Sequence, residues 1–380
     1  MRRILAVTLA VTALTAAWAV PAQAEPAPLV KITKAQGEKV PGQYIVSFKS
    51  DSGVNSAVKS LNKKPLFTYD DALDGFAAKL SAGELSALQH NPNVAMIEED
   101  GVVKVDTTQS NATWGIDRID QRNLPLSTTY TYNSTGSGVT AYIIDTGIAA
   151  THSQFGGRAS NVYNSAGGSN SDCNGHGTHV AGTVGSATYG VAKGVALRGV
   201  KVLNCQGSGS WSGVISGMDW VTANHAANSV ANMSLGGAYN ASVNAAATRM
   251  ANAGVFTAVA AGNENTNACN RSPASASNVT TVAASDRTDT KASFSNYGNC
   301  VEVYGPGVSI TSTWLTGTNT ISGTSMASPH VAGVGALYKA VNGNVSSATV
   351  NSWIASNATS GVIKSNPSGT PNRLVYKANL

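Results

Sequence analysis

From residue 107 onward, short apolar segments alternate with segments of helical pattern. The apolar segments, such as 139–144 (VTAYII), have few polar breaks, which is typical of strands that are buried on both faces. We expect strands at 139–144, 197–203, 230–235 and 254–260, and helices at 176–187, 212–224, 243–253 and 325–340. Strands separated by helices pair in parallel, because the helix carries the chain back to the same edge of the sheet. The sequence therefore predicts an α/β fold: a doubly wound, mostly parallel sheet with helices on both faces.

Residues 25–106 show a different pattern. A stretch rich in Pro, Lys and Ala at 25–41 reads as a linker. After it we expect strands at 42–49, 73–80, 94–98 and 102–105 and helices at 52–61 and 81–90. Ser81 and Glu84 have the spacing of a capping box, which marks the start of the second helix. We therefore predict a small α+β (ferredoxin-like) domain at 25–106, in front of an α/β domain at 107–380.

The first residues have the pattern of a targeting segment. Arg2 and Arg3 form a positive start, residues 4–20 are apolar, and Ala22-Gln23-Ala24 fits the small-x-small pattern of a cleavage site. The alternative is a membrane anchor, since about 17 apolar residues are just enough to cross a bilayer. The site directly after the apolar stretch favours removal. We predict a signal peptide at 1–24 and an extracellular product that is not bound to a membrane.

Charge is unevenly distributed along the chain. Residues 25–106 hold nine Lys and Arg against eleven Asp and Glu, whereas residues 107–380 hold fourteen against nine, so the two parts carry −2 and +5. The basic residues of the second part are scattered singly, which argues against nucleic-acid binding. Opposite signs suit an acidic N-terminal part that binds to the more basic domain.

Four cysteines all lie after residue 170, at Cys173, Cys205, Cys269 and Cys300. An even number of cysteines in an exported chain indicates two disulfides, for which three connectivities are possible. Pairing each cysteine with its nearest neighbour would close two loops of similar length. A zinc site is the rival interpretation, but no C-x-x-C spacing supports it.

Three polar motifs stand at predicted strand or helix ends. Asp145 follows the strand 139–144, while His176 and Ser325 each open a predicted helix. In open α/β sheets, ligands bind outside the carboxyl ends of the strands, where such residues can meet. A carboxylate, an imidazole and a hydroxyl are the parts of an acyl-transfer site.

The motifs around these residues resemble those of the subtilisin superfamily, most closely its proteinase K and aqualysin branch. They are IIDTG at 143–147, NGHGTHVAG at 174–182 and SGTSMASPH at 322–330, and the resemblance covers residues 107–380. It implies that Ser325 is the nucleophile, that His176 is the general base and that Asp145 orients the imidazole. It also implies that Asn263, in the AAGN segment, donates to the oxyanion.

The same resemblance implies a substrate cleft between two segments that take up a peptide as an added β-strand. Its residues are Ser208, Gly209, Ser210 and Trp211 on one side and Ser234, Leu235 and Gly236 on the other, with Ala260, Ala261 and Gly262 nearby. Trp211 would cover the pocket of the fourth substrate residue (P4), although an ordinary exposed aromatic is the plainer alternative. Gly236 and Gly262 leave room for a large P1 side chain. Arg271 stands where the family often carries Tyr near the P1 pocket.

The family needs no catalytic cofactor but commonly binds structural calcium, so we expect structural Ca²⁺. The first implied site consists of the Glu302 carboxylate with the carbonyls of Ser277 and Val279. The second implied site consists of Asp117, Asp120 and Gln121. The alternative at both places is a set of carboxylates without an ion.

The resemblance finally implies that residues 25–106 are a propeptide that assists folding and inhibits the enzyme, and that the chain cleaves itself between Asp106 and Thr107. We therefore expect a secreted, monomeric serine endopeptidase of broad specificity, active at neutral to alkaline pH because its base must be neutral. A lipase is excluded because no Asp–His pair follows Ser325. The remaining alternatives are a binding or scaffold protein on the same fold and an acid-active relative with Glu as base.

Overall fold

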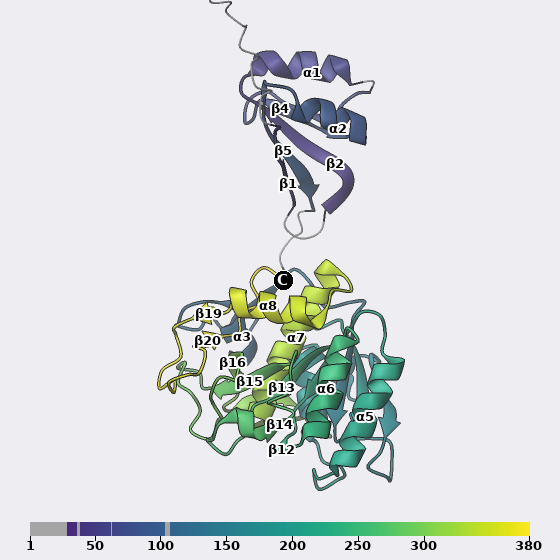
Figure 1. The fold of residues 1–380 in the computed structure, drawn as a ribbon, viewed down its shortest axis with the longest axis vertical. Helices are drawn as coiled ribbons and strands as arrows, with labels where there is room; N and C mark the ends of the chain where they lie inside the picture. The colour runs from purple at the N-terminus through teal and green to yellow at the C-terminus, as the bar shows by residue number, and fades with distance from the viewer. Residues whose placement is uncertain (1–28, 36–38, 62, 103–106) are drawn as a thin grey trace, which may run out of the picture. The chain divides into compact units, whose positions relative to one another are not determined.

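The computed structural model describes residues 29–35, 39–61, 63–102 and 107–380, and Figure 1 shows their ribbon. The predicted signal peptide at 1–24, the predicted cleavage residue Asp106 and part of the linker predicted at 25–41 lie outside these residues. The linker prediction is wrong at 32–33 and 39–41, because these residues pair as strands of a sheet. The chain divides into two compact units, with the division between Val102 and Val103. Each unit is described by itself.

Unit 1, which ends at Val102, has a five-stranded sheet in the order β1-β5-β2-β4-β3 and two helices, α1 and α2. The strands are β1 (Ile32–Thr33), β2 (Lys39–Phe48), β3 (Phe67–Tyr69), β4 (Gly75–Lys79) and β5 (Val94–Gly101), and the helices are α1 (Val54–Ser60) and α2 (Ala82–Gln89). The capping box is confirmed: Glu84 N donates to Ser81 Oγ and Ser81 N donates to the Glu84 carboxylate. The strand expected at 94–98 is β5, which continues to Gly101. Of the strand expected at 102–105, Val102 lies in no strand and the other residues lie outside the described residues.

The sheet of unit 1 has one covered face. Val46, Phe76 and Ile97 are fully buried in the core that includes residues of α1 and α2. The alternate residues of the strands point the other way, and there Phe67 is 62% and Met96 40% exposed. This open face therefore presents large apolar side chains to its surroundings.

Unit 2 confirms the predicted parallel sheet. Its nine strands have the order β19-β20-β16-β15-β13-β11-β8-β10-β9, and every pair is parallel except β19 with β20. The strands are β8 (Thr140–Asp145), β9 (Ala159–Asn164), β10 (Ala196–Lys201), β11 (Ser229–Met233), β13 (Phe256–Ala260), β15 (Thr280–Ser285), β16 (Val303–Pro306), β19 (Thr359–Ser360) and β20 (Arg373–Leu374). Four of these were expected from the sequence: β8, β10, β11 and β13.

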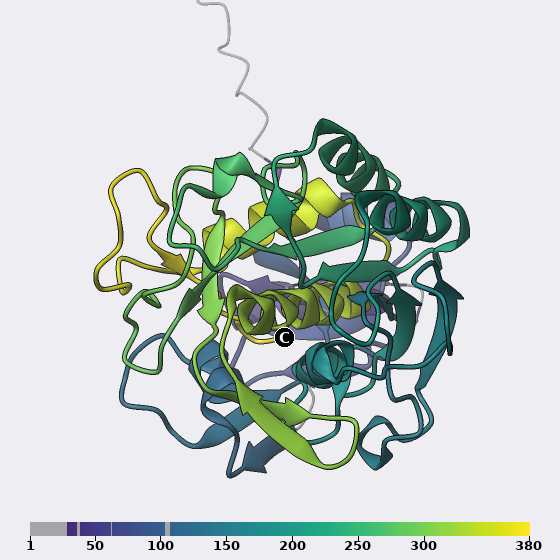
Figure 2. The same ribbon diagram turned by 90° about the horizontal axis from the view of Figure 1, so that it is seen from below.

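Helices cover both faces of this sheet, as expected. They are α3 (Trp114–Asp120), α4 (His176–Gly185), α5 (Trp211–Asn224), α6 (Ala241–Asn252), α7 (Thr324–Asn342) and α8 (Ser347–Asn357). Ile143 of β8 packs in the core with α4 and α7, while its neighbours Tyr142 and Ile144 pack with α5 and α6. Helix α7 is buried along most of its length and lies at the centre of the unit in Figure 2.

Smaller elements surround the sheet. Three two-stranded pairs are β6 (Thr107–Ser110) with β7 (Thr129–Tyr132), β12 (Gly237–Ala238) with β14 (Arg271–Ser272), and β17 (Ile310–Thr313) with β18 (Thr318–Ile321). Two disulfides join Cys173 to Cys205 and Cys269 to Cys300, which is the nearest-neighbour connectivity. Among the helices described, none is long and apolar enough to cross a membrane.

Candidate active site

The three motifs singled out in the sequence all meet the carboxyl edge of the parallel sheet of unit 2. Asp145 is the last residue of β8, His176 is the first residue of α4 and Ser325 is the second residue of α7. Gly175 lets α4 begin there, because its φ is +105° and a Cβ would overlap the ring of Trp314. Short motifs thus decide where each side chain lies.

The structure joins the first two of these residues directly. Asp145 is fully buried, and its Oδ1 lies 2.8 Å from His176 Nδ1 and also accepts a bond from Thr146 N at 2.7 Å. Since the carboxylate accepts a hydrogen bond from Nδ1–H, the other ring nitrogen, Nε2, carries no proton in the neutral ring and is left as the acceptor. This arrangement selects the tautomer that a general base needs.

The environment of His176 raises its pKa. Burial by itself lowers the pKa of the imidazole, but the charge and hydrogen bond of Asp145, and the charge of Asp172, outweigh it. An imidazolium that forms at this position is therefore stabilised by the two carboxylates.

Asp172 is a site residue that the sequence analysis missed. Its Oδ1 accepts from Thr146 Oγ1 (2.9 Å) and from the backbone N–H of Asn174 and Gly175 (2.9 and 3.0 Å). Its Oδ2 accepts from the N–H and hydroxyl of Thr178 at 2.9 and 2.6 Å. The carboxylate thus ties the start of α4 to the residue that follows Asp145. Its signal in the sequence is an acid four residues before a helix that opens with His.

Ser325 lies beside these residues but bonds elsewhere. Its hydroxyl donates to the Ser234 carbonyl at 3.1 Å, and no hydrogen bond to His176 is recorded among the described residues. The two side chains face adjoining cavities, since His176 lines one, Ser325 lines the other, and Leu235 and Gly236 line both. Hydrogen bonds between nucleophile and base are often long before substrate binds.

Asn263 is oriented for a role at the same place. Its Oδ1 accepts from Thr324 N (2.8 Å) and Thr324 Oγ1 (2.9 Å), so its Nδ2 is the end that remains to donate. A Cβ at Gly323 would lie 3.6 Å from Ser325 N and 3.7 Å from Asn263 Nδ2, which places both donors near one point. Two N–H donors beside a nucleophile can bind a developing oxyanion. Thr324, which orients Asn263, was not singled out in the sequence.

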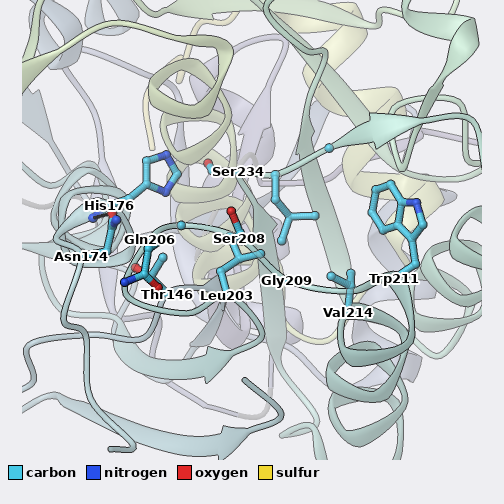
Figure 3. A pocket seen from close by; sticks show the side chains of 13 residues that line it. Thr146, Asn174, His176, Leu203, Gln206, Ser208, Gly209, Trp211, Val214 and Ser234 are labelled. Carbon is cyan, nitrogen blue, oxygen red and sulfur yellow. Dashed lines mark hydrogen bonds between the residues drawn. The ribbon is translucent and has the colours of Figure 1, made fainter. Parts of the chain in front are cut away.

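The larger cavity, here called the His176 cleft, has a volume of about 530 Å³. Figure 3 shows it extending from His176 and Asn174 at one end to Trp211 at the other. It brings together these predicted substrate residues: Ser208, Gly209, Trp211, Ser234, Leu235 and Gly236. Ser210 is absent from the lining and instead caps α5 through its hydroxyl. The residues from 208 to 210 and from 234 to 236 lie in no strand, so they flank the cleft outside the sheet.

Trp211 is packed rather than freely exposed. A Cβ at Gly237 would come within 2.6 Å of the Trp211 ring, so the glycine allows the ring to lie against the backbone of β12. This contact fixes the ring at the end of the cleft.

The smaller cavity, here called the Ser325 pocket, has a volume of about 70 Å³. Its lining includes the predicted residues Leu235, Gly236, Ala260, Ala261, Gly262, Asn263 and Ser325. It also includes Glu264 and Arg271, which form an ion pair. Glu264 was not singled out in the sequence.

Of the first implied calcium site, the structure shows the surroundings of the Glu302 carboxylate. Burial raises the pKa of Glu302 to about 7, and the carboxylate accepts a bond from Thr281 N at 2.5 Å. A cation there would favour the ionised carboxylate. Calcium takes six to eight oxygens, so this carboxylate and the carbonyls of Ser277 and Val279 are half of a shell. No group of three or more His, Cys, Asp and Glu side chains gathers to hold a metal within the described ranges.

The residues of the second implied calcium site do not fit a cation. Asp117 Oδ1 accepts from the Ser127 hydroxyl at 2.9 Å, and its Oδ2 accepts from Thr128 N at 2.7 Å. Asp120 Oδ2 accepts from Thr131 N at 2.7 Å, and its Oδ1 pairs with the ammonium of Lys377 at 2.9 Å. The Gln121 side-chain oxygen accepts from Ser127 N at 3.0 Å. Protein donors already hold these oxygens, and a lysine supplies the positive charge.

Two further histidines near the site have other partners. Burial lowers the pKa of His179 and of His330 to about 4. His179 Nε2 lies 3.0 Å from the Ile310 carbonyl and His330 Nδ1 lies 2.9 Å from that of Met326. Both are neutral core residues.

An imidazole fixed by a buried carboxylate, opposite a serine that begins a helix, needs only an anion-binding point to perform acyl transfer, and Asn263 and Ser325 N supply one. By fold and site, unit 2 is therefore in the class of serine hydrolases built on a parallel α/β sheet.

Comparison with known proteins identifies the family. The profile of the Subtilase family matches residues 136–375, and that of Peptidase inhibitor I9 matches residues 43–106. The chain is similar to an extracellular serine proteinase of a Thermus species (45% identity over 89% of this chain and 90% of that protein). It is similar to a cuticle-degrading protease of Metarhizium anisopliae (47% identity; 96% and 97%). The crystal structure of a cold-adapted subtilisin-like serine proteinase matches with TM-score 0.69 and 50% identity (70% of this chain, 99% of that one). The chain belongs to the subtilase family and is a serine protease with an inhibitor domain.

Proposed function

We propose that this protease is a secreted endopeptidase of broad specificity that uses Asp145, His176 and Ser325 as its triad. The observation that carries the proposal is the 2.8 Å contact between Asp145 Oδ1 and His176 Nδ1 at the edge of the cleft next to Ser325. A binding protein would not need a base whose tautomer is selected in this way.

The reaction follows from the geometry. His176 Nε2 takes the proton of the Ser325 hydroxyl as its oxygen attacks the peptide carbonyl, and then gives that proton to the leaving amine. The oxyanion accepts from Asn263 Nδ2 and Ser325 N, and one such donor is worth about 2.7–4 kcal/mol. Water, activated by the same imidazole, then releases the acyl group from Ser325. No cofactor takes part in these steps.

The substrate lies extended in the His176 cleft. The residues from 208 to 210 and from 234 to 236 border the cleft without belonging to a sheet, and they pair with the backbone of the peptide. Pairing through main-chain groups makes binding tolerant of sequence. Trp211, packed at the end of the cleft, favours an apolar P4 side chain.

The chain is made as a precursor. Residues 1–24 are the signal peptide, residues 25–106 are the propeptide, and self-cleavage between Asp106 and Thr107 leaves the peptidase domain at 107–380. Two facts support the propeptide: the inhibitor profile ends at residue 106, and unit 1 has its own core and an open apolar sheet face. Its partner is the protease part of the same chain, which acts as a monomer. Calcium, where bound, is held by Glu302 and the carbonyls of Ser277 and Val279 and stabilises the fold.

The test is hydrolysis of casein by the wild type and by Ser325→Ala, with mass analysis of both chains. We expect the wild type to digest casein and to mature at Thr107, while the variant does neither and remains joined at Asp106–Thr107. Equal digestion by the variant would refute the assignment of Ser325. A mature N-terminus far from Thr107 would refute the cleavage site.

A further inference from the structure

The wall of the Ser325 pocket contains two opposite charges. Arg271 comes from β14, which pairs with β12 through the register of Ala238 with Arg271, and the disulfide at Cys269 anchors the segment before it. Glu264 comes from the loop that follows β13. Their ion pair lies beside Gly262 and Ser325, which line the same cavity. A side chain that enters this pocket therefore meets charged groups.

The carboxylate of Glu264 is fully engaged. One oxygen accepts from Arg271 Nη2, and the other accepts from Asn296 Nδ2 at 2.8 Å. Asn296 is fully buried and also accepts from the backbone N–H of Glu264 at 3.1 Å. The position of Glu264 is thus fixed from inside the protein, and its negative charge is matched by Arg271.

The guanidinium of Arg271 has N–H donors that are available to a ligand. An arginine has five N–H donors, and within the described part of the chain Glu264 is the one recorded acceptor for this side chain, which is 26% exposed. The Asn263 amide and the N-terminal end of α7 add further positive character on the Ser325 side of the pocket. Among the side chains that line the pocket, Arg271 and Asn263 therefore keep N–H donors for a ligand.

We propose that Arg271 is a specificity-determining residue, and that the Ser325 pocket takes P1 side chains that end in a hydrogen-bond acceptor, namely glutamate and glutamine, and rejects lysine and arginine. This inference rests on the proposed function, because it assigns the P1 residue of the same reaction. The substrate oxygen accepts from the free donors of Arg271. For a P1 cation, Arg271 offers only N–H donors, and both oxygens of Glu264 already accept from Arg271 and Asn296, so the cation finds no acceptor that is free of a partner.

The experiment uses four peptide p-nitroanilides that differ only at P1, with Phe, Gln, Glu or Lys there. The quantity compared is kcat/KM for each relative to Phe within the same enzyme sample, so that differences in active concentration cancel. In the wild type we expect Gln and Glu to be cleaved readily and Lys to be the poorest. In Arg271→Leu we expect the Glu:Phe ratio to fall about tenfold, the order expected for one charge-assisted hydrogen bond.

A second variant should change the Glu:Phe ratio of kcat/KM in the opposite direction. Glu264→Gln removes the competing carboxylate, so the Glu:Phe ratio should rise about threefold and should fall again with added salt. Arg249→Leu, which removes an exposed positive charge from the last turn of α6, is the matched control and should leave every ratio unchanged. An unchanged Glu:Phe ratio in Arg271→Leu, or wild-type cleavage after Lys as fast as after Gln, would overturn the proposal. Failure to cleave any of the peptides or casein would instead count against the proposed function.

Discussion

Two corners of unit 2 bury carboxylates and treat them in opposite ways. Asp145, at the candidate active site, is fully buried, and its Oδ1 accepts hydrogen bonds from His176 Nδ1 and Thr146 N. Asp117, under the segment before β7, is equally buried, and both of its oxygens accept hydrogen bonds from Ser127 and Thr128. The imidazole bound to Asp145 can gain and lose a proton, whereas Ser127 and Thr128 donate to Asp117 from groups whose charge does not change. The contrast distinguishes the carboxylate that we propose for catalysis from one whose partners are those of a structural residue.

The same contrast appears in how positive charge is supplied. Asp145 faces an imidazole whose charge depends on its proton. Asp120, three residues after Asp117 on the same helix, instead faces the ammonium of Lys377 at 2.9 Å. Lysine is permanently charged at neutral pH, while histidine gains and loses its charge. Catalysis by a base needs a partner such as histidine, whose charge changes. A structural ion pair needs a partner such as lysine, whose charge is constant.

The strongest test of this comparison is Asp145→Asn. It keeps the shape of the side chain but favours the wrong imidazole tautomer, so we expect self-processing and casein hydrolysis to slow by about 10⁴-fold, as in another triad enzyme with this change. The melting temperature should change little. The rate at which the precursor mass disappears measures the effect within one molecule. Asp219→Asn, at an exposed position of α5, is the control. Normal processing by Asp145→Asn would mean that this carboxylate is structural after all.

Asp117→Ala should give the reverse result. It leaves the N–H of Thr128 and the hydroxyl of Ser127 without their acceptor, so the free energy of unfolding should fall by about 1–3 kcal/mol. Per active molecule, kcat/KM should remain at the wild-type value. Thermal unfolding gives the first quantity, and titration of active sites followed by casein hydrolysis gives the second. A loss of kcat/KM without loss of stability would erase the distinction between the two corners.

The sequence indicated the surroundings of Asp145 better than those of Asp120. IIDTG, NGHGTHVAG and SGTSMASPH are short motifs, and their resemblance to those of the subtilisin superfamily singled out Asp145, His176 and Ser325. The structure places these three residues at a strand end and at two helix starts. Asp120 is bonded to Thr131 and Lys377, which lie 11 and 257 positions further along the chain. No local sequence pattern predicts these partners. For the same reason Asp120 resembled a calcium ligand until its partners were known.

The strands divide in a similar way. β8 and β11 were expected because the segments 139–144 and 230–235 are mostly apolar, whereas β15 (TTVAAS) and β16 (VYGP) were not expected. Their threonines and glycine lie fully buried between neighbouring strands and α7, so tertiary packing rather than the residues themselves makes them strands. Asp172 was missed although four of its five donor groups belong to the nearby residues 174, 175 and 178. The bond that links it to the residue after Asp145, from Thr146 Oγ1, forms only once α4 and β8 are together.

A smaller effect is expected from the second carboxylate of the active-site corner. Asp172 helps to raise the pKa of His176, and the base must be neutral, so kcat/KM is lost as pH falls through that raised pKa. Asp172→Asn should move the acidic limb of the kcat/KM profile to lower pH, by less than about one unit. A folded-state pKa above the unfolded value also means that the Asp145–His176 pair stabilises the fold at low pH and loses that contribution as pH rises through it. An acidic limb that stays in place or moves upward would show that the Asp172 charge does not reach His176.

The smallest expected effect concerns calcium at Asp120, whose two oxygens already bind Thr131 and Lys377. Ligand binding stabilises a protein by RT ln(1 + [L]/Kd), so the rise in melting temperature with added Ca²⁺ reports each site. Because Lys377 and Thr131 occupy the oxygens of Asp120, Asp120→Asn should lower the melting temperature but leave its dependence on Ca²⁺ unchanged. Glu302→Gln is the matched comparison, and any dependence on Ca²⁺ should disappear in it. The opposite result is that the dependence of the melting temperature on Ca²⁺ survives Glu302→Gln and is lost in Asp120→Asn. It would mean that calcium displaces Lys377 and that Asp120 is a calcium ligand.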